Sequence, residues 1–454
     1  MDLIIANIVD AYRDNVALIQ DPALRRSEVL DNLYLADRAL LWCGDRKLVV
    51  TSLPVEPAHV RYLKEALGYR TLENLYPSEA SESLIEDLLR DGELRARIVA
   101  RLRDEPEVAL ISFMASPQVL ELADVLRREG LAVTTPECPA CADLAARDEL
   151  DSKAGFRRFF TRIQPQVPGV RIPEGVVARD PAEAARAAAG FMAGGRGCVI
   201  KPNNSQSGVG FIILPAGSLP GNPAEVERAI RERLESDSQM TCDVVVVEEW
   251  IDIDKSIGGG SPSIEMRVPA DPRRDVEFLY LCGQILTPTG YFCGVEMYAG
   301  VAGGRLDPII EAAGVAVARE MRKLGYVGYF DMDLVVDRRG VPYAVEVNTR
   351  RTGGTHAHEA AEAIYGPRYW ERAAVISNSN QRFGGPALDY AGLQALLGDI
   401  LFPAAGRKEG ILPAIVSSLV ENRFGYIAFG GTIERAREIE EAMFRRLAES
   451  GRPV

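Results

Sequence analysis

One segment, residues 331–350 (DMDLVVDRRGVPYAVEVNTR), constrains the fold more than any other stretch of the chain. Two apolar runs flank the turn sequence DRRG at 337–340, a pattern that predicts a β-hairpin. Pairing through this turn brings Asp333 beside Glu346, and Asn348 shares a face with Glu346 because side chains alternate along a strand. Acids within apolar strands are costly without a counter-ion, and Mg²⁺ prefers carboxylates combined with phosphates and water. We interpret Asp333, Glu346 and Asn348 as a magnesium site; the alternative is a surface hairpin with chance acids.

A second segment, residues 198–210 (CVIKPNNSQSGVG), has the pattern of a strand followed by a loop of small residues. Lys201 at the end of the strand supplies a point charge. Small residues let backbone N–H groups approach phosphate oxygens closely. This pattern indicates a phosphate-binding loop, although a Gly/Ser hairpin after a strand is also common without any ligand.

A third segment, residues 244–251 (VVVVEEWI), ends an apolar strand with two carboxylates. A Glu248 side chain in this position suits the exocyclic amine of adenine, and the backbone groups that follow suit the edge of the ring. The alternative interpretation is a sheet edge with two solvated acids.

A fourth segment, residues 348–358 (NTRRTGGTHAH), places two arginines before a Gly-Gly pair. The guanidinium groups of Arg350 and Arg351 match the two oxygens of a carboxylate or phosphate. His356 and His358 lack a third ligand for zinc, so we predict that they line a polar site or begin a helix.

The rest of the chain predicts an α/β and α+β multidomain fold. Apolar runs at 47–52, 109–113 and 131–135 alternate with helical patterns at 56–67 and 117–129, which indicates a parallel, Rossmann-like sheet. No G-x-G-x-x-G is present there, so a dinucleotide site is not expected. Residues 198–295 are strand-rich, 308–324 predict a long helix, and 353–382 predict polar helices. From residue 383 the pattern indicates a small C-terminal α/β unit.

The charge and cysteine content exclude several classes of protein. A net charge of -13 opposes binding to nucleic acid or anionic membranes. No apolar run approaches the roughly 18–20 residues that span a bilayer, and the acidic start lacks the basic region of a secretory signal. Seven cysteines, an odd number, argue against a disulfide framework, and we expect Cys138 and Cys141 to be reduced thiols. These features predict a cytoplasmic protein.

Together the segments resemble the ATP-grasp superfamily. The order is the same: Lys153 before the central domain, the V-x-K-P strand with its loop, the E-E-x-I hinge and the D…E-x-N hairpin. The resemblance covers about residues 140–365. It implies a Rossmann-like pre-ATP-grasp domain at 1–145, an ATP-grasp domain at 146–382 and a C-terminal α/β unit at 383–454.

The resemblance also implies roles for individual residues. Lys153 and Lys201 would contact the nucleotide, Arg350 would act on an acyl-phosphate, and Asp254 would reach the ribose. Adenine would be held by Glu248 and by the backbones of Glu249 and Ile251. The phosphate loop would comprise Ser205, Ser207, Gly208 and Gly210. The cofactors implied are ATP and two Mg²⁺ ions at Asp333, Glu346 and Asn348, with Mn²⁺ as a substitute.

The segment at 348–358 and the C-terminal unit are similar to the peptide ligases of pheganomycin-type antibiotic biosynthesis. That similarity implies an ADP-forming peptide ligase that couples a small carboxylic or modified amino acid to an amino acid or peptide amine, and a homodimer. One departure concerns the D-alanine–D-alanine ligase branch, which has an arginine two residues before the metal aspartate. Here that residue is Asp331, so Arg267, Arg350 and Arg351 are the candidates for the catalytic charge.

Two other functions remain open at this point. The first is a ligase that joins two free amino acids or small molecules. The second is an ATP-binding regulatory module without catalysis, which would be indicated by the loss of a metal ligand or a lysine. Asp333, Glu346, Asn348 and Lys201 are all present, which favours an enzyme.

Overall fold

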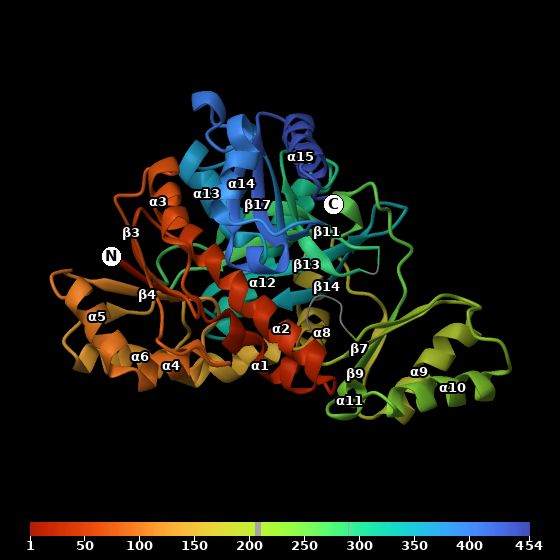
Figure 1. Cartoon of the computed structure of the whole chain (residues 1–454). Helices are drawn as coiled ribbons and strands as arrows, with labels where there is room; N and C mark the ends of the chain where they lie inside the picture. Colours follow the sequence, from red (N-terminus) through yellow and green to blue (C-terminus); the bar gives the residue numbers. More distant parts are fainter. Residues whose placement is uncertain (205–209, 289) are drawn as a thin grey trace.

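The computed structural model describes residues 1–204, 210–288 and 290–454. Within them the chain forms one parallel and two antiparallel sheets, of five, eight and four strands (Figure 1). The predicted mixed α/β architecture is therefore confirmed. The proposed domain boundaries at 145/146 and 382/383 stay predictions.

The N-terminal sheet is parallel throughout and has the strand order β3-β2-β1-β4-β5. Its strands are β1 (Asp2–Ile5), β2 (Arg46–Val50), β3 (Thr71–Leu75), β4 (Val108–Ser112) and β5 (Val133–Thr134). The predicted parallel sheet is confirmed, and β1 and β3 are additions to it. β1 is short, and β3 has the partly polar sequence TLENL, so neither shows a strong apolar pattern.

The strands of this sheet are connected by helices (Figure 1). They are α1 (Ile8–Ala17), α2 (Pro22–Tyr34), the 3₁₀ segment η1 (Leu35–Leu41), α3 (Pro57–Ala66), α4 (Leu84–Arg90), α5 (Gly92–Leu102) and α6 (Pro117–Arg128). α2, α3 and α6 each begin with proline just after a side chain that caps the helix, the arrangement expected at a helix start. η1 follows α2 directly, without a loop between them.

The eight-stranded sheet has the order β14-β13-β10-β11-β12-β15-β17-β16. Its strands are β10 (Pro262–Val268), β11 (Glu277–Leu286), β12 (Phe292–Met297), β13 (Gly328–Val336), β14 (Pro342–Asn348), β15 (Ala374–Arg382), β16 (Gly410–Ile415) and β17 (Arg423–Gly430). The helices α12 (Asp307–Lys323), α13 (Thr355–Tyr365), α14 (Tyr390–Leu397) and α15 (Ile433–Glu449) occur between and after these strands. The strands of the C-terminal segment thus extend the sheet that contains the predicted metal hairpin.

The structure corrects the prediction of helices throughout 353–382. Residues 355–365 form α13 as expected, but Ala374–Arg382 form β15, which pairs with β12 and β17. The second half of AVISNSNQR is polar, so the sequence pattern did not indicate a strand. His356 and His358 lie in the first turn of α13, as predicted for a helix start, and both are buried.

The four-stranded sheet forms a separate layer with the order β6-β9-β7-β8. Its strands are β6 (Gly175–Ala178), β7 (Cys198–Pro202), β8 (Ile212–Leu214) and β9 (Val245–Glu249). Two helices, α9 (Pro181–Ala193) and α10 (Pro223–Glu235), supply apolar side chains to its core and project away from the rest of the molecule (Figure 1). Before this sheet, α7 (Leu144–Asp151) and α8 (Lys153–Ile163) connect it to the N-terminal sheet; the short α11 (Ser238–Thr241) precedes β9.

None of the helices in the described residues is both long and apolar enough to cross a membrane. Cys138 and Cys141 are free thiols, as expected.

Candidate active site

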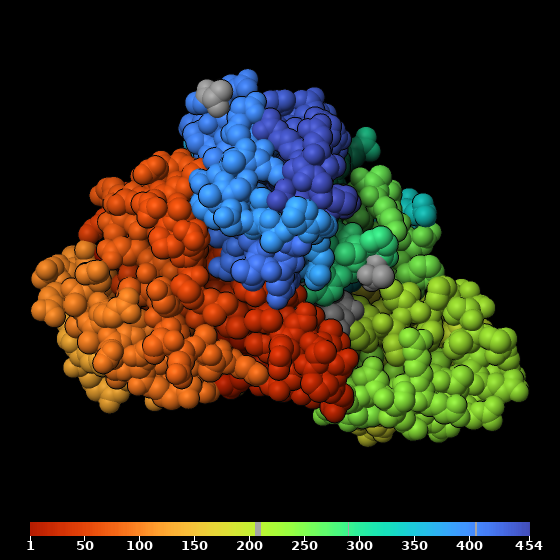
Figure 2. Space-filling model, in the orientation of Figure 1, coloured from red at the N-terminus to blue at the C-terminus, as the bar shows by residue number. Residues whose placement is uncertain are grey.

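A cavity of about 480 Å³ is lined by residues of the N-terminal segment, the four-stranded sheet and the eight-stranded sheet. Figure 2 shows the N-terminal segment in red between the blue C-terminal part and the yellow-green four-stranded layer. The cavity wall contains Lys201, Glu248, Glu249, Ile251, Asp333, Glu346, Asn348 and Arg350 from the predicted site. Segments far apart in sequence, predicted separately, are thus brought to one place.

The other predicted residues lie elsewhere. Lys153 contacts the cavity wall through Glu346. Gly210, Asp254, Arg267 and Arg351 are not among the lining residues. Ser205, Ser207 and Gly208 fall outside the described residues.

The predicted metal hairpin consists of β13, β14 and the turn between them, and its strands pair as the sequence predicted. β13 and β14 are antiparallel, with Asp333 opposite Glu346 and Asp331 opposite Asn348. Gln284 on β11 donates from Nε2 to Asp333 Oδ1 at 2.7 Å. Burial and the charge of Glu346 raise the pKa of Asp333 to about 7. Both effects disfavour the ionised carboxylate, the first by removing water and the second by repulsion between like charges. The donor set of two carboxylates and one amide fits Mg²⁺, which takes its remaining ligands from phosphates and water.

Among the residues that the structure describes, no group of three or more His, Cys, Asp or Glu forms a complete metal cage. Mg²⁺ in nucleotide sites is bound by one or two carboxylates plus substrate phosphates, and not by a cage made entirely of protein.

Asp331 is a residue whose role the sequence did not reveal. Its Oδ1 accepts hydrogen bonds from the backbone N–H of Asn348 at 3.2 Å and from Asn348 Nδ2 at 2.8 Å. The amide nitrogen is therefore held by Asp331, which leaves Asn348 Oδ1 for a cation. We interpret Asp331 as a residue that orients Asn348.

Two lysines form ion pairs with acids of the site. Lys153 Nζ lies 3.0 Å from Glu346 Oε1, and Lys201 Nζ lies 2.5 Å from Glu248 Oε2. Both ammonium groups lie 5.5 Å from the centre of the Phe211 ring. All four charged groups are largely buried, so their interactions are little screened by salt. Each ammonium group is thus held in a fixed position by an acid of the cavity wall.

The Glu248 side chain lies between two cations. Its Oε1 accepts from Arg157 Nη1 at 3.0 Å, while Oε2 pairs with Lys201. This carboxylate holds Lys201 in place, and the contact of Glu248 with adenine stays a prediction. At the predicted hinge, the N–H groups of Glu249 and Trp250 donate to the carbonyls of Glu174 and Gly197.

Asp254 is occupied by a local contact outside the cavity wall. It accepts hydrogen bonds from the backbone and hydroxyl of Ser256, and these bonds lower its pKa. Its predicted contact with a ribose has no support from this placement.

Arg350 lies two residues after Asn348, the last residue of β14. Its guanidinium lies over the rings of Tyr12 and Phe113, at 5.4 and 5.6 Å. Although burial opposes the charge, the neighbouring Tyr12, Asp151, Asp331 and Glu346 raise the pKa of Arg350. It is thus a firmly held cation on the cavity wall.

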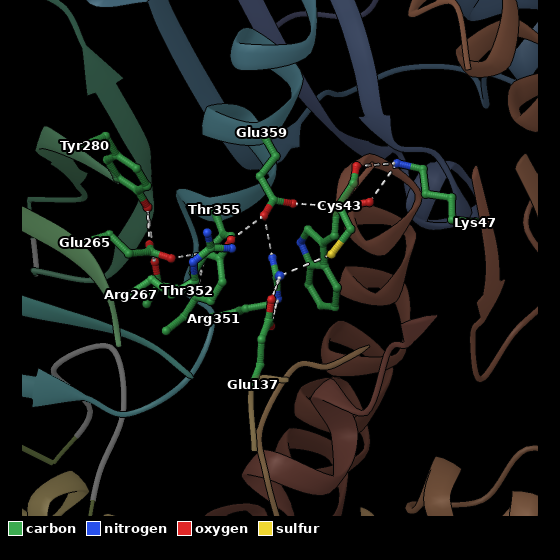
Figure 3. A network of polar contacts seen from close by, with 12 residues as sticks. Cys43, Lys47, Glu137, Glu265, Arg267, Tyr280, Arg351, Thr352, Thr355 and Glu359 are labelled. Atoms are coloured by element: carbon green, nitrogen blue, oxygen red, sulfur yellow. Dashed lines mark hydrogen bonds and ion pairs between the residues drawn. The ribbon is translucent and has the colours of Figure 1, made fainter. Parts of the chain in front are cut away.

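Arg351 points away from the cavity, against expectation. Its guanidinium is 2.8 Å from Glu137 Oε1 and 2.9 Å from Glu359 Oε1, and also contacts Cys43 Sγ (Figure 3). Glu359 in turn accepts the backbone N–H of Cys43. Arg350 lines the cavity and Arg351 does not, so the two guanidinium groups do not face one anion in the cavity. Arg351 is a buried link between the N-terminal and central parts of the chain.

Arg267 also lies outside the cavity wall. It pairs with Glu277 through Nε at 2.7 Å, across the ends of β10 and β11. Of the three arginines predicted to be catalytic, the structure places Arg350 alone on the cavity wall.

Glu265 is a buried acid that sequence reasoning missed. It accepts hydrogen bonds from the hydroxyls of Thr352 and Thr355, each at 2.6 Å, and from the Tyr280 hydroxyl (Figure 3). These contacts tie the start of α13 to β10 and β11. Burial raises the pKa of Glu265 to about 7.

Replacing Glu265 with glutamine is expected to flatten the dependence of stability on pH. The folded-state pKa of about 7 lies above the ordinary value of 4.5. The contribution of Glu265 to the free energy of unfolding is thus complete below pH 4.5 and is lost as the pH rises through 7. The loss is about 3 kcal/mol. Urea denaturation of both proteins at pH 5 and pH 8 measures it, with exposed Glu311→Gln as control. If the difference between Glu265→Gln and wild type is the same at both pH values, Glu265 does not titrate in this range.

Comparison with known proteins supports the architecture. Residues 36–127 match the Pre ATP-grasp domain family. The chain contains a pre-ATP-grasp domain. This confirms the resemblance to ATP-grasp proteins that carry such a domain.

One curated relative extends over most of the chain. The L-propargylglycine--L-glutamate ligase of Streptantibioticus cattleyicolor is 27% identical over 365 residues, which cover 74% of this chain and 70% of that protein. The similarity includes far more of the sequence than the pre-ATP-grasp domain alone.

Solved structures match the fold along nearly the whole chain. A biotin carboxylase from Campylobacter jejuni in complex with β-γ-ATP is 11% identical, with a TM-score of 0.56 over 98% of this chain and 91% of that one. N5-carboxyaminoimidazole ribonucleotide synthetase from Thermus thermophilus is 14% identical, with a TM-score of 0.51 over 99% and 98%. The predicted ATP-grasp fold is confirmed by these similarities.

Proposed function

We propose that the chain is an ATP- and Mg²⁺-dependent ligase that joins a carboxylate to an amine through an acyl-phosphate. The observation that carries the proposal is the metal hairpin, whose Asp333 and Glu346 lie in one cavity with Lys201 and Arg350. A fold shared by many proteins does not define an activity. The proposal therefore depends on these side chains, together with the ligase relative.

Each group has a role in the first step. A carboxylate oxygen of the donor attacks the γ-phosphorus of ATP, and the bond to the β-phosphate oxygen breaks, releasing ADP. Asp333, Glu346 and Asn348 would hold Mg²⁺, which would supply positive charge to the phosphoryl oxygens. Lys153 and Lys201 bind phosphate oxygens, and Arg350 binds the acyl-phosphate. Asp331 keeps Asn348 oriented during the reaction.

The second step forms the amide. The amine nitrogen attacks the acyl carbon, and the bond from that carbon to the phosphate oxygen breaks. The proton lost from nitrogen passes to the departing phosphate or to water. Holding donor and acceptor together provides much of the rate, and exclusion of water protects the acyl-phosphate from hydrolysis. A cavity lined by three parts of the chain suits the first requirement.

The substrates proposed are amino acids or small peptides. The relative's name pairs L-propargylglycine with L-glutamate, and we propose a related peptide ligase in the biosynthesis of a peptide natural product. Because that name joins two amino acids, the pairing of two free amino acids is favoured over a longer peptide acceptor. Two Mg²⁺ ions, replaceable by Mn²⁺, a cytoplasmic location, a homodimer and no nucleic-acid or membrane partner complete the proposal.

We expect ADP and inorganic phosphate as the nucleotide products, because the acids and lysines surround the position of a γ-phosphoryl group. The measurement is a phosphate-release screen over pairs of the twenty proteinogenic L-amino acids and L-propargylglycine, with mass spectrometry of the products. AMP and pyrophosphate in equal amounts would rule out the acyl-phosphate route. An ATP-binding regulatory module would bind nucleotide and release no phosphate with any pair.

A further inference from the structure

One face of α2 and η1 forms part of the cavity wall beside the metal hairpin. Glu28, Asp31, Asn32, Leu35 and Arg38 all line the cavity. Their spacings of three, four, seven and ten residues place them on one side of the helix. The N-terminal domain therefore contributes a continuous stripe to the site, and the proposed roles of the ATP and metal residues do not use it.

Arg38 is an unusual member of this stripe. Only 4% of its surface is exposed. In the part of the chain that the structure describes, its polar contact is from Nε to the backbone carbonyl of Leu35 at 3.3 Å, and no carboxylate forms an ion pair with it. A buried guanidinium without a counter-ion is costly. Burial and the nearby Arg350 both lower the pKa of Arg38, to about 10.

The surroundings of Arg38 add a further donor and supply no competing acid. Asn32, six residues earlier, is also buried on the cavity wall, and its Nδ2 lacks an acceptor among the described residues. The acids of the stripe lie toward its other end. Asp31 is engaged by Arg423, and Glu28 is ten residues, or about 15 Å of helix, from Arg38. An arginine fork and an amide N–H with free hydrogen-bonding capacity match the oxygens of a carboxylate.

We propose that Arg38, with Asn32, binds a carboxylate group of an amino-acid substrate. This inference rests on the proposed ligase function and deepens it. The group is either the α-carboxylate of the amine acceptor or the carboxylate of the donor. Both have the same chemistry. Arg38 lines the same cavity as Asp333 and Glu346, so a carboxylate bound to Arg38 would lie in the cavity that contains the proposed metal site.

Arg38→Met tests the proposal because it removes the charge and the guanidinium donors and keeps an unbranched apolar stem. The KM for the amino acid that carries the bound carboxylate should rise about 100-fold, the loss expected for a charge-assisted hydrogen bond in a buried site. The KM for ATP should change less than about threefold. Arg26→Met, on the exposed side of α2, is the matched control and should behave as wild type.

Two arms identify the source of the carboxylate, using the amino-acid pair with the highest phosphate release in the screen. In the first, the acceptor is compared with its α-amide. If Arg38 binds the acceptor, the KM of wild type should be about 100-fold higher for the amide than for the acid. The KM of Arg38→Met should differ less than threefold between the two. In the second, hydroxylamine replaces the acceptor and traps the acyl-phosphate as a hydroxamate. A 100-fold rise in donor KM in that assay assigns the carboxylate to the donor.

The outcomes also separate this inference from the proposed function. Hydroxamate formation by wild type tests acyl-phosphate formation whatever Arg38 does. If wild type is active and folded Arg38→Met retains both amino-acid KM values within threefold, the carboxylate subsite is wrong. Should Arg38→Met not fold, Asn32→Asp replaces it, since an added negative charge should raise the same KM by about tenfold or more.

Discussion

Glu346→Ala should lower amide formation at least about a hundredfold while the protein remains folded. Glu346 lies opposite Asp333 in the hairpin and contacts Lys153 Nζ at 3.0 Å. Its removal takes away a proposed metal ligand and also the partner that holds Lys153 in place. Loss of electrostatic stabilisation of this kind costs two to three orders of magnitude in turnover.

Phosphate release with the best amino-acid pair measures this effect, with thermal denaturation as the check on folding. Glu311→Ala is the control, because Glu311 is an exposed glutamate on α12. It should retain full activity. A folded Glu346→Ala protein with more than about a tenth of wild-type turnover would exclude Glu346 as a metal ligand. Raising Mg²⁺ should restore little activity, since the defect includes the position of Lys153.

Arg351→Met should destabilise the fold by about 3–5 kcal/mol. Arg351 is about 1% exposed and pairs with Glu137 and Glu359. Burial raises the pKa of Glu137, and Arg351 opposes this shift. Removing the cation leaves two buried carboxylates without compensation, which is the costly way to break a buried pair. Urea denaturation measures the change.

Two further variants identify the cause. Arg101→Met breaks a surface pair with Glu73, in which both side chains are more than two-fifths exposed, and should cost less than about 1 kcal/mol. The triple variant Arg351→Met/Glu137→Gln/Glu359→Gln should regain much of the lost stability, because the stranded charges are gone. If Arg351→Met costs no more than Arg101→Met, the buried link does not stabilise the fold.

The sequence predicted best those parts that depend on local patterns. The pairing of Asp333 with Glu346 follows from two apolar runs, one turn and a period of two, and all three lie within twenty residues. The parallel N-terminal sheet follows from the alternation of apolar runs and helical patterns. Where the alternation of apolar and polar residues is weak, the prediction is wrong: Ala374–Arg382 form the strand β15 and not a helix.

Residues whose roles depend on distant partners could not be identified from the sequence. Arg350 and Arg351 are equivalent in a sequence pattern, but one faces the cavity and the other is held by Glu137 and Glu359. Asp331 was noted as a departure, and its hydrogen bonds to Asn348 became evident only in the structure. Arg38 lies more than 300 residues before Arg350, and no motif connects them.

The continuity of the eight-stranded sheet limits how such a chain can acquire new substrates. β13 and β14 carry the proposed metal residues, and β15, β16 and β17 continue the same hydrogen-bonded sheet toward the opposite edge. In many multidomain enzymes, recombination exchanges a terminal module and with it the specificity. Here such an exchange would leave β15 without its neighbour β17, so the remainder would present an unpaired edge prone to aggregation. Diversification is therefore expected through point substitutions on the cavity wall, with the strand order inherited intact.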